Sequence, residues 1–161
     1  MSSSGTNETP LTELSFSVSG RIARPVAEVY EAVADPAQLS KYFTTGGARG
    51  RLEPGAEVSW DFHDFPGRFP VQVVEADPPR RLVIRWEAEG GMVGPDNTVT
   101  FEFEPIDDDA RTLVTITESA WRADPEGARI AFGNCEGWTG MLAGMKVWLE
   151  HRITLREGFY A

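Results

Sequence analysis

The stretch that decides the fold is residues 98–118, which read TVTFEFEPIDDDARTLVTITE. Apolar side chains alternate with polar ones on both sides of the acidic run Asp107–Asp109, at Val99, Phe101, Phe103, Val114 and Ile116. A period of two indicates strands that bury one face, and a run of aspartates is typical of a turn. The stretch therefore predicts a β-hairpin, with Glu118 at an inward-pointing position near the end of its second strand.

The same alternation extends upstream from this hairpin. It recurs in residues 14–22, 57–62, 69–73 and 82–86. Turn-forming residues separate these runs at 53–55, 65–67, 77–79 and 90–91, and we interpret 46–50 as a flexible turn that leads into a strand. No helical pattern interrupts the strands after residue 49, so we expect an antiparallel meander of six strands there.

Helical signals lie on either side of the meander. Pro25 suits the first turn of a short helix, and Asp35 is a candidate N-cap for a second one over 36–42. Asp124 caps a long C-terminal helix, predicted to run to about residue 157 with Gly158 at its end. Gly133 is a candidate position for a break in this helix.

These elements predict an α+β protein. One strand, two short helices, six strands and a long helix follow one another, and only the last helix is long enough to cover the apolar face of the sheet. We expect a curved antiparallel sheet of about seven strands wrapped around that helix. Residues 13–161 form one domain in this interpretation, and residues 1–12, rich in Ser and Thr, form a loose tail.

Four motifs resemble a known family. They are ARPVAEVY at 23–30 with ADP at 34–36, EADPPRRLVIRWE at 75–87, LVTITES at 113–119, and Gly137-Trp138 followed by Leu142 and Trp148-Leu149-Glu150. This order is similar to that of the START-related helix-grip (SRPBCC) superfamily, in the branch named after the activator of heat-shock-protein-90 ATPase. The resemblance implies the helix-grip fold. It leaves the function open, because the superfamily includes lipid carriers, polyketide cyclases, hormone receptors and proteins that dock on chaperones.

Composition narrows the classes of partner. The net charge of −10 argues against nucleic acids and anionic membranes, which both require a basic surface. The N-terminus does not resemble a signal peptide, and the single cysteine, Cys135, fits a reducing cytoplasm. No spacing of His, Cys or acidic residues suggests a metal site, and nothing calls for a cofactor. Self-association into a homodimer stays open.

Aromatic residues on the inward face of the predicted sheet point toward a face of the long helix that bears a tryptophan and two methionines. The set comprises Trp60, Phe62, Phe69, Trp86, Phe101, Trp138, Met141 and Met145. They can form an ordinary core, or they can bound a cavity, because a strongly curved sheet and a single helix often leave space between them. We expect a cavity that holds a small hydrophobic ligand.

Polar residues predicted to face this space are few. Glu118 points inward by alternation, and Asn134 lies on the long helix. Many relatives carry a histidine at the position of Glu118, so the carboxyl is a departure from the family pattern. It can orient a ligand or transfer a proton, or it can be a strand-end residue that reaches water. His63 and His151 are expected at exposed positions without a catalytic role.

Three functions follow, in order of preference. The first is a binding module that holds a small hydrophobic ligand. The second is a polyketide-cyclase-like enzyme that uses Glu118, the one weak catalytic candidate, for proton transfer. The third is a stress-related or co-chaperone-like interaction protein, suggested only by the name of the family. An enzyme of the second kind would place at least two titratable groups in the cavity, and the sequence predicts one.

Overall fold

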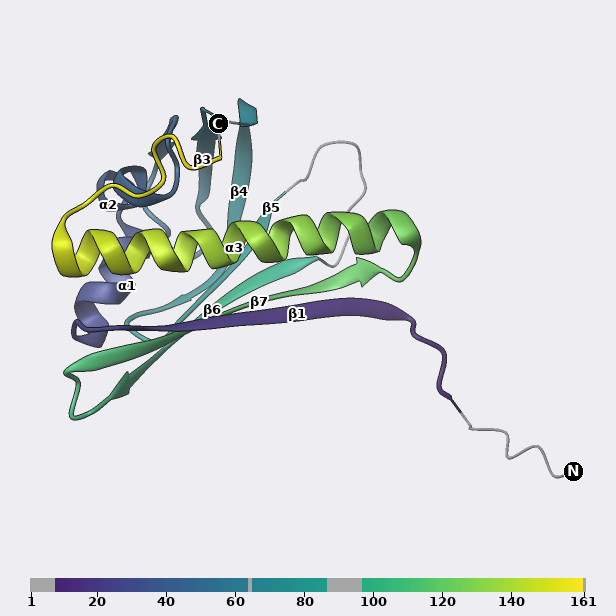
Figure 1. Cartoon of the computed structure of the whole chain (residues 1–161), viewed down its shortest axis with the longest axis horizontal. Coiled ribbons are helices and arrows are strands. Elements are labelled where there is room, and N and C mark those ends of the chain that lie inside the picture. Colours follow the sequence, from purple (N-terminus) through teal and green to yellow (C-terminus); the bar gives the residue numbers. More distant parts are fainter. Residues whose placement is uncertain (1–7, 64, 87–96, 161) are drawn as a thin grey trace, which may run out of the picture.

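The computed structural model of the chain describes residues 8–63, 65–86 and 97–160 (Figure 1). In chain order the elements are β1 (Glu13–Ile22), α1 (Val26–Ala34), α2 (Pro36–Tyr42), β2 (Gly47–Arg49), β3 (Glu57–Phe62), β4 (Phe65–Asp77), β5 (Arg81–Trp86), β6 (Thr98–Ile106), β7 (Arg111–Arg122) and α3 (Pro125–His151). The predicted order of one strand, two short helices, six strands and a long helix is confirmed, although the sixth strand is β2, which lies in a stretch predicted as a turn.

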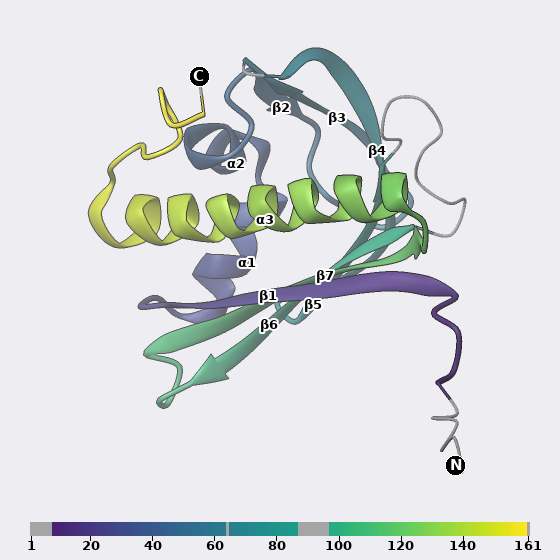
Figure 2. The ribbon, with the colours of Figure 1, turned by 45° about the vertical axis from the view of Figure 1, so that its right-hand side comes forward.

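The strands form one antiparallel sheet in the order β1-β7-β6-β5-β4-β3-β2. β2 to β7 form a meander, and β1 joins its end by pairing with β7. The sheet curves around α3, which packs against β1 and β7, while α1 and α2 lie at the end of the helix where its last turns are (Figure 2). This is the α+β helix-grip architecture that the sequence predicts.

The predicted faces of the strands are confirmed. Trp60 and Phe101 are fully buried beneath α3, and Trp86 is half-buried. Arg85, next to Trp86 in the sequence, is exposed on the opposite face. Because a shift of one residue would invert every side chain, this result fixes the register of the central strands.

β7 contains a β-bulge that matters for the site. Phe16 of β1 pairs with Glu118, but Leu14 pairs with Trp121, so β7 has one residue more than β1 in this interval. Ala120 lies within it and has a positive φ of 63°. The extra residue allows Glu118 and Trp121 both to point inward, where each is almost completely buried.

Helix boundaries agree with the predicted caps at their N-terminal ends. The Asp35 carboxylate accepts from the Ala37 N–H at 2.9 Å, and the Asp124 carboxylate accepts from the Gly127 N–H at 2.7 Å.

α3 runs through Gly133 without a break and ends at His151, so the predicted end near residue 157 is wrong. Arg152 ends the helix in the left-handed region, with its N–H donating to the Trp148 carbonyl at 2.8 Å. Gly158 lies in a later turn.

Two predicted turns are strands. The stretch taken as a turn at 46–50 contains β2, which pairs with residues 59–61 of β3. Its glycines permit close approach, because a Cβ on Gly46 would lie 2.6 Å from the Asp61 Cγ. β4 begins at Phe65, inside another predicted turn, and its first residue pairs with Phe62.

The turn predicted at Gly90-Gly91 lies outside the described residues. Within 8–63, 65–86 and 97–160, no helix is both long and apolar enough to cross a membrane.

Candidate functional site

The candidate site is centred on Glu118 of β7, whose side chain has no exposed surface. The indole Nε1 of Trp138 donates to its Oε1 at 2.7 Å, and the indole Nε1 of Trp86 donates to its Oε2 at 3.0 Å. The amide of Asn134 donates to Oε1 at 3.2 Å. We call Trp86, Glu118, Asn134 and Trp138 the Glu118 cluster.

Three elements position the Glu118 cluster. Asn134 and Trp138 are four residues apart on α3 and therefore lie on the same face of the helix. Trp86 is the last residue of β5, and Glu118 lies just before the bulge in β7. Both strand residues have inward-pointing side chains, so the sheet supplies the carboxyl and one donor while the helix supplies two donors.

Two opposing effects act on the carboxyl of Glu118. Burial removes water from the charged form and is the larger effect, so the pKa of Glu118 is raised above its ordinary value. Hydrogen bonds from Trp138, Trp86, Asn134 and Asn97 act in the opposite direction, because they stabilise the carboxylate. The side chains that bond to this carboxyl are all neutral.

An aromatic shell surrounds the cluster. Trp86 contacts Trp138 with ring centroids 5.5 Å apart, and Trp60 and Phe69 contact Trp86 at 6.4 and 5.5 Å. Phe101 meets Trp138 edge to face at 5.6 Å. Met141 and Met145 are fully buried in the same core. The structure therefore brings four of the predicted site residues into direct hydrogen-bonding contact and packs others around them.

Phe43 belongs to this shell, although the sequence analysis missed it. Its ring stacks on Trp138 at 5.4 Å and also contacts Phe62 at 5.0 Å. Phe43 directly follows α2, outside any alternating or helical pattern, so no periodic signal marks it. The guanidinium of Arg156 lies 5.9 Å from the Phe43 ring and 5.2 Å from the Phe62 ring, so the segment after α3 covers this end of the shell.

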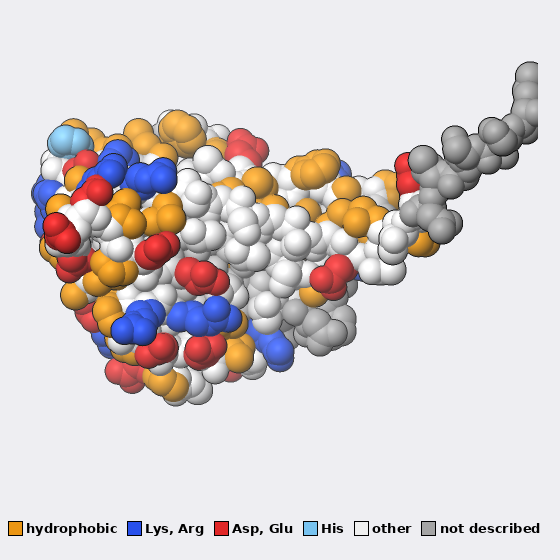
Figure 3. Space-filling view, turned by 90° about the horizontal axis from the view of Figure 1, so that it is seen from below, with side chains coloured by type: hydrophobic (Ala, Val, Ile, Leu, Met, Phe, Trp, Pro, Cys, Tyr) orange, Lys and Arg blue, Asp and Glu red, His pale blue; other side chains and the backbone are white. Residues whose placement is uncertain are grey.

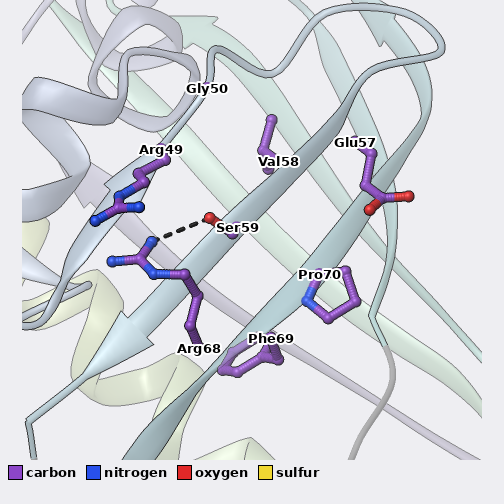
Figure 4. Close-up of a pocket in the computed structure, with 8 residues that line it drawn as sticks. All are labelled: Arg49, Gly50, Glu57, Val58, Ser59, Arg68, Phe69 and Pro70. Carbon is purple, nitrogen blue, oxygen red and sulfur yellow. Dashed lines mark hydrogen bonds between the residues drawn. The ribbon is translucent and has the colours of Figure 1, made fainter.

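A pocket lies at the β2 edge of the sheet, away from the Glu118 cluster. It measures about 490 Å³, is open to solvent and is lined by residues of β2, β3 and β4. Figure 4 shows Arg49 and Arg68 side by side in it, with Arg68 donating to the Ser59 hydroxyl at 3.0 Å. Around the Glu118 cluster, where a cavity is expected from the sequence, the rings of Trp60, Phe69, Trp86, Phe101 and Trp138 contact one another.

The histidines lie away from the cluster. His63 and His151 are both exposed, at the end of β3 and of α3. Cys135 is a half-buried free thiol beside Asn134 in the sequence. Within the described part of the chain, no group of three or more His, Cys, Asp or Glu side chains is arranged to hold a metal ion.

Comparison with known families explains this arrangement of elements. Residues 23–150 match the family described as activator of Hsp90 ATPase homolog 1-like protein. The chain belongs to this family. The matched residues begin just before α1 and end at the last turn of α3, so they include every residue of the Glu118 cluster.

Several solved structures have a fold similar to that of this chain. A protein from Staphylococcus saprophyticus is 22% identical with a TM-score of 0.73, and the match covers 89% of this chain and 96% of that one. The Aha1 dimer from Colwellia psychrerythraea is 18% identical with a TM-score of 0.68, over 86% and 97% of the two chains. DynU16, from the dynemicin biosynthetic locus, is 28% identical with a TM-score of 0.67, over 89% of this chain and 49% of its own. None of the curated proteins matches the chain.

Proposed function

We propose that this family member binds a small hydrophobic molecule at the Glu118 cluster. The observation that supports this is a fully buried carboxyl bonded only to neutral donors. Burying an ionisable group without a cation beside it costs roughly several kcal/mol of folding free energy. A well-packed apolar residue at the same position would make a more stable core. A carboxyl retained at such a position serves recognition better than stability.

The surroundings define the chemistry of the ligand. Indole and phenyl rings favour a flat or ring-containing apolar body, and the carboxyl favours a hydroxyl or N–H on it. Trp86, Phe69 and Asn134 are the partly exposed members of this region, whereas Trp60, Phe101 and Trp138 are buried. The ligand enters on this partly exposed side in our proposal, displaces the Trp86 ring and takes over its hydrogen bond to Oε2.

A dye titration tests this proposal. Trp86→Ala removes the displaceable ring, so the neutral dye Nile red, which has no hydroxyl or N–H and tests the apolar part of the site, should bind this variant several-fold more tightly than the parent protein, with a blue-shifted emission. Trp148→Ala is the matched control, because Trp148 is also half-buried but bonds to Gln38 at 3.4 Å, away from the cluster. If Trp86→Ala and Trp148→Ala bind the dye equally, the proposed site is wrong.

The second candidate is a polyketide-cyclase-like enzyme in which Glu118 passes a proton. It is favoured by the raised pKa of Glu118 and by the resemblance to DynU16, which belongs to a biosynthetic locus. The side chains bonded to Glu118 are tryptophans and asparagines, which do not titrate, so this carboxyl has no paired acid or base among them. For this reason binding ranks first. Under the enzyme alternative, turnover of a polyketide substrate would fall by about 10² or more in Glu118→Gln while binding persists.

We also propose that two copies of the chain associate. The support is the shared fold of the Colwellia psychrerythraea protein, which is described as a dimer. Sedimentation velocity of the purified chain tests this, and a single species of monomer mass at every concentration would contradict it. A co-chaperone role has no support beyond the name of the family.

A further inference from the structure

We propose that two copies of this chain pair through their β1 strands, in antiparallel orientation, about a two-fold axis at Ser17. This inference rests on the proposed self-association and assigns a surface to it. It is independent of the Glu118 cluster, because β1 is the edge strand of the sheet and no described strand pairs with its free side.

β1 lacks the features that protect edge strands from pairing with other chains. It is ten residues long, contains no proline or lysine, and its residues 14–20 carry no charge. The bulge at this end of the sheet lies in β7, so β1 alternates without interruption. Proteins avoid edge-to-edge pairing with short strands, prolines, charges or bulges in the edge strand. Residues 14–20 of β1 contain none of these features, and its two charged residues, Glu13 and Arg21, lie at its ends.

The sequence of β1 is complementary to itself. It reads Glu13-Leu-Ser-Phe-Ser-Val-Ser-Gly-Arg21, with Ser17 at the centre. When an antiparallel copy is placed about Ser17, Glu13 faces Arg21 of the second copy at both ends. Phe16 faces Val18, and Ser15 faces Ser19. Opposite charges and matched side chains at directly opposed positions stabilise antiparallel pairs.

The charge of the chain restricts where two copies can meet. Two molecules that each carry −10 repel one another, so a stable contact is favoured where acidic groups are few and are paired with basic ones. Hydroxyl side chains continue from β1 across the outer face of the sheet, at Ser15, Ser17, Ser19, Thr115, Thr117, Thr98 and Thr100. Figure 3 shows a broad area without charged side chains across the middle of the molecule, seen from below.

The helix above β1 is compatible with a second copy. Lys146 donates to the Arg21 carbonyl at 3.0 Å, which identifies the side of α3 that faces β1. Ala143, Thr139 and Phe132 share this side by helical spacing, and all three are exposed. The small residues allow a second α3 to approach. Phe132, 74% exposed, would be covered by that helix.

Charge reversal tests the proposed pairing in the full chain. Glu13→Arg and Arg21→Glu each place like charges opposite one another twice per dimer, so each should raise the dimer dissociation constant on the order of tenfold. The double variant restores opposite charges and should recover the parent value. Gln72→Glu on β4, far from β1, adds a negative charge to the same outer face and should have little effect. Equal dimerisation of all four variants would overturn the interface but leave self-association standing.

A disulfide tests the position of the axis. In a Cys135→Ser background, Ser17→Cys should form a dimer disulfide under mild oxidation, because directly opposed Cα atoms lie about 4.5 to 5.5 Å apart. Ser19→Cys, on the same face, should not, because the two copies of residue 19 would lie about 13 Å apart along the strands. Cross-linking of Ser19→Cys as fast as Ser17→Cys would overturn the register. A parent chain that stays monomeric would overturn both the interface and the self-association.

Discussion

Both carboxyl oxygens of Glu118 already accept hydrogen bonds from neighbouring side chains. Oε1 accepts from Trp138 and Asn134, and Oε2 accepts from Trp86. The ionised form satisfies all three donors, whereas a protonated carboxyl needs an acceptor that the indoles cannot provide. A ligand carbonyl or a reversed Asn134 amide would supply one. Binding and protonation are therefore coupled at this residue.

Glu118→Gln should lower the free energy of unfolding by about 1 to 3 kcal/mol, since its NH₂ group must face an indole N–H and one buried donor loses its partner. Chemical denaturation measures the loss. Glu136→Gln on the exposed side of α3 is the control and should change stability by less than about 0.5 kcal/mol. A loss as small in Glu118→Gln would mean that Trp86 or Asn134 rotates away without penalty.

The raised pKa of Glu118 makes a second prediction, about pH. The folded protein retains the Glu118 proton at pH values where the unfolded chain has released it, so the folded state binds more protons in that window. The free energy of unfolding therefore falls as the pH rises from about 4.3 toward the raised pKa. Denaturation of the parent protein and Glu118→Gln across this range should show that the stability of the parent falls relative to that of the variant, in which other carboxyls titrate as they do in the parent. A difference that grows with pH instead would show that the pKa is lowered.

At the scale of elements, α3 has glycines with opposite surroundings. A Cβ on Gly144 would lie 2.9 Å from the Tyr42 carbonyl oxygen, whereas a Cβ on Gly137 would have no neighbour within 4 Å. Gly144 thus sets how closely α3 approaches α2. Gly137 only weakens the helix.

Gly144→Ala should destabilise the protein by about 1 to 3 kcal/mol, because the added methyl group separates α3 from the end of α2. Gly137→Ala, two turns earlier, should stabilise it by up to about 1 kcal/mol through helix propensity alone. Thermal unfolding of the two variants measures both effects. Stabilisation by Gly144→Ala would show that the two helices separate easily.

Periodicity predicted the elements well and the contacts between them less well. Alternation around Trp60, Phe101 and Glu118 is a local pattern, so the sequence predicted which side chains face inward. The contacts of Glu118 with Trp86 and Asn134 join residues far apart in the chain, and no local pattern contains them. β2 escaped detection because three residues are too few to show a period, and its glycines resemble a turn.

The cavity is the part of the site that sequence could not settle. The aromatic residues that would bound it are the same residues that would fill it, and only their packing separates the two cases. Ring contacts such as those of Trp86 with Trp60 and Trp138 depend on distances that composition does not encode.

At the scale of the whole molecule, the β6–β7 hairpin reaches the start of α1. Pro25 precedes this helix and provides no side-chain cap, while the Asp109 carboxylate at the hairpin tip accepts from the Val26 N–H at 2.8 Å. An acidic side chain beside a helix N-terminus also complements the helix dipole. One carboxylate thus connects the far end of the sheet to the helices.

Asp109→Ala should cost about 1 kcal/mol more than Asp108→Ala, because both replace an aspartate with a positive φ but only Asp109 caps α1. Urea denaturation of the two variants gives this difference directly. Equal losses would assign the effect to the backbone conformation of the turn and not to the cap.

The two indoles that share the Glu118 carboxyl give the protein a spectroscopic signature. The chain has five tryptophans, and the side-chain N–H of each gives one resonance in a ¹H–¹⁵N spectrum. Those of Trp86 and Trp138 donate to a carboxyl and should move to lower field than that of Trp148, which donates to an amide. Both should shift together as Glu118 titrates. When a ligand displaces the Trp86 ring, its resonance alone should move upfield, so binding and protonation can be read separately from two peaks.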